Sequence, residues 1–167
     1  MWEYGGDDWM RYQLRRKLFA FGDDFTVKDE TGADCYIVDG KVFTLGHRVI
    51  IRNMQGNEEA TIHQHIIALL PTYEITRNGQ ELAEVRKKLT LFREGFTVDI
   101  PGPDDLAVQG DLFDHEYAFT RDGQTIASVS KQWFTLRDSY GVEVEPGVDP
   151  VLILASAIVI DLVNEDQ

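Results

Sequence analysis

Two histidines in this sequence have the type and spacing of metal ligands. His63 and His65 stand two residues apart on a predicted strand, so both side chains project from the same face of that strand. Two ligands do not make a metal site, and a third would have to come from His47, His115 or a carboxylate. We therefore expect a solvent-facing pair of strand residues and predict no metal ion.

A second group could act by general acid–base chemistry. It consists of Asp111, Asp114, His115 and Glu116. The sequence around it has neither a serine or cysteine in a nucleophile elbow nor a glycine-rich phosphate loop that follows a strand and opens a helix. Aspartates in such a stretch commonly accept hydrogen bonds from turn amides. We therefore predict that this stretch forms turns, and that the protein has no catalytic residue and no cofactor. The alternative is a hydrolase or metal-dependent enzyme that uses Asp111, Asp114 and His115.

Two clusters of basic side chains suit the binding of a phosphorylated headgroup, provided that they meet in space. The candidate ligand-binding residues are Arg15, Arg16, Lys17, Arg86 and Lys88. Alternation along a strand puts Arg86 and Lys88 on one face and Lys87 on the other. The alternative is that these charges protect strand edges from aggregation. One contiguous basic face would favour an anionic lipid such as a phosphoinositide, whereas dispersed charges would favour a protein partner.

The net charge of −13 is unevenly distributed along the chain. Residues 1–93 hold 13 basic and 14 acidic side chains, while residues 94–167 hold 3 basic and 15 acidic ones. The second half should repel nucleic acid and anionic membranes, so any lipid contact must use the first half. Adaptation to high salt or simple solubility explains this acidity without a partner; a cationic ligand or partner is the alternative.

The expected location is the cytoplasm, with a peripheral position at the membrane if the protein binds lipid. Residues 1–10 lack the basic region and apolar run of a secretory signal. The lone Cys35 cannot form an internal disulfide, which agrees with a reducing compartment.

The elements that must position these residues are mostly strands. From Tyr12 to Glu145, short runs rich in Val, Ile, Thr, Tyr and Phe alternate with turn dipeptides. Asn78-Gly79 and Asp122-Gly123 are the dipeptides favoured in type I′ hairpin turns, where both central residues need positive φ. The spacing predicts about a dozen strands, too many for one open twisted sheet.

An internal repeat supports this interpretation. Residues 73–100 align without gaps on residues 117–144, with 10 of 28 positions identical. The shared positions lie at a hairpin turn and along the strands around it. Two copies are too few for a solenoid, so we expect them to be sectors of one barrel.

The end of the chain predicts a buried helix. Asp149-Pro150 has the pattern of an N-cap followed by proline at the first helical position. The following segment, VLILASAIVIDLV, is apolar on every side except at Asp161, so the helix must be enclosed. It is about 14 residues long, whereas a membrane span needs roughly 20 apolar residues. We therefore predict no transmembrane span.

Motifs spread along residues 12–163 resemble the LURP-one-related family of the tubby C-terminal-like group. They include Phe21-Gly22-Asp23-Asp24-Phe25, Leu69-Leu70-Pro71-Thr72-Tyr73, Gly110-Asp111-Leu112-Phe113-Asp114-His115 and Val129-Ser130-Lys131-Gln132-Trp133. The resemblance implies a mainly β fold: a closed antiparallel barrel of about twelve strands that encloses a hydrophobic C-terminal helix. The domain should span residues 12–163 with its helix at 150–163, after a disordered leader (residues 1–11) and before a tail (residues 164–167).

The same resemblance narrows the function without assigning it. Tubby domains bind phosphoinositides through basic residues in a motif that has no counterpart here, and fold alone does not transfer an activity. We expect a non-enzymatic binding or scaffolding domain that contacts either an anionic lipid headgroup or a protein partner.

Overall fold

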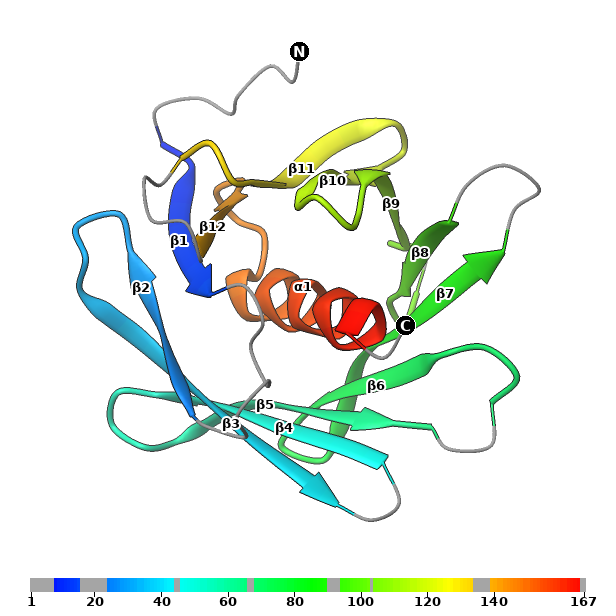
Figure 1. Cartoon of the computed structure of the whole chain (residues 1–167), viewed down its shortest axis with the longest axis horizontal. Coiled ribbons are helices and arrows are strands. Elements are labelled where there is room, and N and C mark those ends of the chain that lie inside the picture. The colour runs from blue at the N-terminus through cyan, green and yellow to red at the C-terminus, as the bar shows by residue number, and fades with distance from the viewer. Residues whose placement is uncertain are drawn as a thin grey trace.

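In the computed structural model of the chain, alternating hydrophobic patterns become strands that wrap around one helix (Figure 1). The structure describes residues 8–15, 24–43, 46–65, 68–89, 94–102, 104–133 and 139–165. The strands are β1 (Met10–Arg15), β2 (Phe25–Asp29), β3 (Asp34–Phe43), β4 (Gly46–Asn53), β5 (Glu58–Gln64), β6 (Thr72–Arg77), β7 (Gln80–Leu89), β8 (Glu94–Asp99), β9 (Leu106–Asp111), β10 (Glu116–Arg121), β11 (Gln124–Ser130) and β12 (Ser139–Val144). The helix is α1 (Pro150–Glu165).

These twelve strands close into an antiparallel barrel. Each strand pairs with its neighbours in sequence, and β1 closes the ring by pairing with both β2 and β12. The predicted fold class, a closed barrel of about twelve strands around a C-terminal helix, is therefore confirmed. β1 begins at Met10, inside the stretch expected to be a leader, and α1 continues to Glu165. Residues 1–7 of that leader lie outside the described residues.

The two repeat copies form equivalent hairpins. Asn78 and Asp122 have φ values of 52° and 51°, as the type I′ turn requires. The β6–β7 and β10–β11 ladders each shift register just before the turn, after Ile75 and Phe119, which are 44 residues apart. The copies thus form two sectors, β6–β8 and β10–β12, on either side of β9.

The helix begins where the sequence predicts. The Asp149 carboxylate accepts a hydrogen bond from the Val151 amide at 3.0 Å, which caps the first turn. The guanidinium of Arg77, at the end of β6, donates to both oxygens of that carboxylate at 2.9 and 3.4 Å. This ion pair attaches the start of α1 to the barrel wall.

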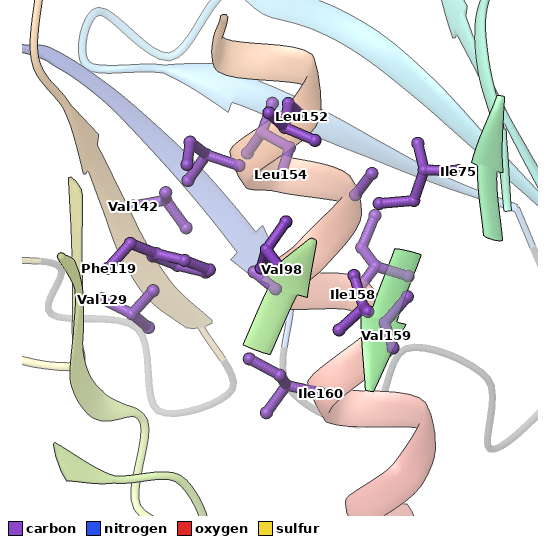
Figure 2. Close-up of a cluster of buried hydrophobic side chains, with 14 of the residues drawn as sticks. Ile75, Val98, Phe119, Val129, Val142, Leu152, Leu154, Ile158, Val159 and Ile160 are labelled. Atoms are coloured by element: carbon purple, nitrogen blue, oxygen red, sulfur yellow. The ribbon is translucent and has the colours of Figure 1, made fainter. Parts of the chain in front are cut away.

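Residues 151–163 of the helix are all buried, so α1 is enclosed along this length. Figure 2 shows aliphatic helix side chains such as Leu154 and Ile158 among inward-facing side chains of the strands, including Ile75, Val98 and Phe119. The helix and these side chains form one continuous core. The apolar character of α1 thus comes from its position inside the barrel.

Candidate functional site

The antiparallel order gives the barrel two distinct ends. Arg77 contacts the start of α1, so the β6–β7 turn lies at what we call the helix-start rim. The β9–β10 turn contacts the end of α1 and lies at the helix-end rim. Because neighbouring strands are antiparallel, every second connection belongs to the same rim. The helix-start rim comprises residues 29–34, 53–58, 77–81, 99–102, 104–105, 121–124 and 145–149. The described part of the helix-end rim comprises residues 15, 24, 43, 46, 65, 68–71, 88–89, 94, 111–116, 131–133 and 139.

The two predicted basic groups lie on opposite sides of the barrel. β1, which ends at Arg15, and β7, which carries Arg86 and Lys88, are six steps apart in a ring of twelve strands (Figure 1). Arg16, Lys17 and the side chain of Arg15 lie outside the described residues. With about 4.8 Å between neighbouring strands, one headgroup cannot bridge the two groups.

The same topology places both basic groups near the same rim of the barrel. An even number of antiparallel steps separates β1 from β7, so both strands run toward the helix-end rim. Arg15 is the last residue of β1, and Lys88 is the next-to-last residue of β7. A flat surface at this rim can therefore contact both groups. Arg86 is less available, because its guanidinium pairs with the Glu84 and Asp99 carboxylates.

The proposed acid–base group is divided among structural contacts. The Asp111 carboxylate accepts a hydrogen bond from the Asp114 amide at 2.9 Å, as an aspartate in a turn does. Asp114 pairs with the Lys131 ammonium. The Glu116 carboxylate accepts hydrogen bonds from the Ser130 hydroxyl and the Lys131 amide, both at 3.0 Å. These carboxylates tie the β9–β10 turn to the segment after β11.

His115 makes a contact that the local sequence pattern did not predict. Its Nε2 lies 2.7 Å from Oδ1 of Asp161, the charged residue in the apolar face of α1. The Tyr140 hydroxyl donates to the other Asp161 oxygen at 2.5 Å, and the Tyr140 ring stacks on His115 with centroids 4.5 Å apart. The interruption at Asp161 was a visible sign of a buried polar partner, but the sequence did not say which residue it meets.

This buried network is suited to holding the helix. Asp161 and Tyr140 are both buried, and His115 uses one ring nitrogen on the helix carboxylate. Tyr117 is fully buried. This burial and, to a smaller extent, the nearby Asp161 carboxylate raise the pKa of its hydroxyl well above 10. The Tyr140 hydroxyl that donates to Asp161 helps to fix the position of this carboxylate, whereas nucleophilic catalysis needs an activated group within reach of a substrate.

A second buried acid lies on β12. Glu143 is fully buried, and in the described part of the chain neither carboxylate oxygen has a hydrogen-bond partner. The Arg11 guanidinium lies 3.8 Å from one of these oxygens. Burial raises the pKa of Glu143, and the Arg11 guanidinium lowers it by a smaller amount.

The histidine pair lies elsewhere, at the end of β5. His63 and His65 are both exposed, and His65 Nε2 is 3.6 Å from a Glu74 oxygen. Within the described ranges, groups of three or more His, Cys, Asp or Glu side chains suited to holding a metal ion are absent. Nor does the described part of the chain contain a helix of the length and apolarity needed to cross a membrane.

The two rims differ strongly in charge. Among the described residues, the helix-start rim has 11 acidic and 2 basic residues, whereas the helix-end rim has 5 acidic and 3 basic ones. The acidic residues of the helix-start rim are Asp29, Glu30, Asp34, Glu58, Glu81, Asp99, Asp104, Asp105, Asp122, Glu145 and Asp149. Three large apolar side chains, Leu69, Leu89 and Phe113, are exposed at the helix-end rim. The barrel is thus polarised along the helix axis, and its helix-end rim is the candidate binding surface.

Comparisons with known proteins agree with this fold. Residues 10–161 match the family described as LURP-one-related. The chain is 32% identical over 157 residues to the uncharacterized protein YxjI of Bacillus subtilis (strain 168), an alignment covering 92% of this chain and 95% of that protein. The X-ray structure of the Arabidopsis thaliana protein AT5G01750 is similar with a TM-score of 0.69 and 18% identity, covering 93% of this chain and 91% of that one, which supports the fold. Neither relative's name indicates a catalytic activity. The chain belongs to the LURP-one-related family.

Proposed function

We propose that this protein is a non-enzymatic binding domain that docks its helix-end rim on an anionic lipid surface. The observation that carries the proposal is the charge difference between the rims: 11 acidic against 2 basic residues at the helix-start rim, and 5 acidic against 3 basic residues at the helix-end rim. An anionic membrane repels the helix-start rim and leaves the helix-end rim as the end that approaches.

The positions of the basic groups support a surface in preference to a pocket. β1 and β7 stand on opposite sides of the barrel and end at the same rim. A single headgroup reaches one of them, while a bilayer plane contacts both. Lys88 is exposed, and Arg15 ends the opposite strand. Dispersal of the basic groups by itself favours a protein partner, so protein binding is the outcome that remains if lipid binding fails.

The enzymatic alternative has less support. Asp111 accepts a turn amide, Asp114 pairs with Lys131, and His115 contacts a buried carboxylate of the helix. Each contact accounts for its residue without a substrate.

Vesicle co-sedimentation tests the proposal. The purified chain is mixed with phosphatidylcholine vesicles, with and without phosphatidylserine or a phosphoinositide, at low and high salt. We expect binding that requires the anionic lipid and weakens as salt rises, because the screening length falls from about 8 Å at physiological ionic strength to about 3 Å at 1 M.

Charge-reversal variants identify the rim. A variant with Arg15, Arg16 and Lys88 changed to Glu should lose binding to anionic vesicles. Lys28→Glu makes the same type of charge change near the helix-start rim, where Lys28 pairs with Asp34, and should bind as the parent chain does. Equal binding by all variants at every salt concentration would contradict electrostatic docking, and failure of the parent chain to bind any vesicle would refute the lipid proposal.

A further inference from the structure

Exposed apolar side chains at the helix-end rim are not explained by the charge pattern. Leu69 is fully exposed, and Leu89 and Phe113 are 68% and 58% exposed. Met10 and Met54, also exposed, are at the helix-start end of the barrel, near its many carboxylates. Single exposed apolar residues are common in soluble proteins, so the arrangement of the three at one rim is what matters.

Leu69 and Leu89 come to the same height on neighbouring elements. Thr72 of β6 is in register with Arg86 of β7, and the Lys87 amide donates to the Pro71 carbonyl at 3.0 Å. Leu69 is three residues beyond Thr72 toward the rim, and Leu89 is three residues beyond Arg86 in the same direction. The two leucines therefore project from adjacent parts of the rim.

Phe113 is presented by a turn that is fastened to the helix. The Leu112 carbonyl accepts a hydrogen bond from the Asn164 side chain at 3.1 Å, and the Leu112 side chain is buried. Two residues after Phe113, His115 contacts Asp161 at 2.7 Å. Since the turn is held by α1 on both sides of Phe113, the outward position of this ring is set by the fold. The contact between His115 and Asp161 therefore supports the turn that carries Phe113 at the rim.

The charged side chains beside the leucines suit a lipid–water interface. Lys88 is exposed and directly precedes Leu89, so an ammonium and an apolar side chain occupy adjacent positions at the end of β7. In a bilayer interface a lysine keeps its charge among the headgroups while apolar neighbours reach deeper. With 5 acidic and 3 basic residues, this rim opposes such an approach far less than the helix-start rim does.

From these observations we infer that Leu69, Leu89 and Phe113 are apolar anchors that insert into the interfacial layer of a bilayer, with His115 and Asn164 as positioning residues for Phe113. The inference rests on the lipid docking proposed above and adds a component of binding that salt does not weaken. Burial of apolar surface does not depend on charge screening.

The test compares two triple variants in the full chain. One carries Leu69→Ser, Leu89→Ser and Phe113→Ser, and the other is the charge-reversal variant described above. Met10→Ser with Met54→Ser is the matched control, since it removes exposed apolar side chains from the opposite end. Partition is measured on anionic vesicles at low and high salt, after thermal melts have shown that each variant folds.

We expect the parent chain and the methionine control to retain part of their binding at high salt, and the serine variant to lose at least about tenfold in partition, equivalent to about 1.4 kcal/mol. If the parent chain and the serine variant bind anionic vesicles equally, the anchors are refuted and the proposed docking stands. If the parent chain binds no vesicle, the proposed function fails first, and protein binding takes its place.

A site-specific probe gives a second readout. With Cys35 changed to Ser, an environment-sensitive dye is attached at Phe113→Cys or, as a control, at Met54→Cys. We expect a blue shift of the emission on adding vesicles for the dye at position 113 alone. Vesicle binding without this shift would overturn the assignment of Phe113 as an anchor. His115→Gln should reduce the shift more than it reduces sedimentation, because it frees the turn without removing the apolar ring.

Discussion

Placing a carboxyl group at Ile158 tests the enclosure of the helix most directly. Ile158 is fully buried and belongs to the same continuous core as Ile75 and Val98 (Figure 2). Removing a buried isoleucine side chain costs about 2–5 kcal/mol. An isolated carboxyl group in such surroundings resists ionisation, with a pKa that can reach about 8–9, against about 3.9 for an unfolded aspartate.

These values give the expected magnitude for Ile158→Asp. At pH 7, about three pH units above the pKa of an unfolded aspartate, the new side chain is ionised in the unfolded chain but neutral in the folded chain. This difference adds about 4 kcal/mol to the loss of stability. The total of about 6–9 kcal/mol is comparable to the whole stability of a domain. Because the folded pKa is raised, the penalty is smallest at low pH and grows by about 1.4 kcal/mol for each pH unit above about 4.

Urea unfolding followed by circular dichroism at several pH values measures this penalty. Ile158→Asn is the matched control, since it has a similar size and polarity and does not ionise. We expect the difference between the two variants to grow by about 2.7 kcal/mol from pH 5 to pH 7. If the stability difference between the Asp and Asn variants is the same at every pH, or if each variant loses less than about 1 kcal/mol of stability, position 158 is hydrated and the helix is not enclosed.

Three further changes probe the barrel and its rims. Deleting residues 149–167 removes the helix from the core, and we expect an aggregating chain; a soluble product with a cooperative melt would contradict the threaded barrel. Gly110→Ala should destabilise the β9–β10 hairpin strongly, because the backbone of Gly110 in β9 has a φ of 133° and an added Cβ would lie 2.5 Å from the Glu116 carbonyl oxygen; an unchanged melting temperature would refute this. Glu143→Gln should match the parent chain at low pH and exceed it in stability at neutral pH, because burial raises the pKa of Glu143 and ionisation then costs stability as the pH rises. A less stable glutamine variant at pH 7 would mean that the ion pair with Arg11 outweighs the burial.

The local patterns of the sequence were sufficient for the elements. Alternating apolar residues, the Asn78-Gly79 and Asp122-Gly123 turns and the Asp149-Pro150 helix start act over a few neighbouring residues, so each can be recognised without knowing the rest of the chain. The apolar helix also indicated its own enclosure, since every side of it needed a partner. Together with the family resemblance, these patterns predicted the closed barrel.

The candidate binding surface required the tertiary structure. Whether the basic groups meet depended on the ring order, which places β1 and β7 on opposite sides of the helix and ends both at one rim. The contact between His115 and Asp161 joins residues 46 positions apart, and that between Arg77 and Asp149 joins residues 72 positions apart. Hydrophobic periodicity states which face of an element is buried but not which residue lies opposite. Long-range pairing arises only when the whole ring closes, and closure also brought Leu69, Leu89 and Phe113 to one end.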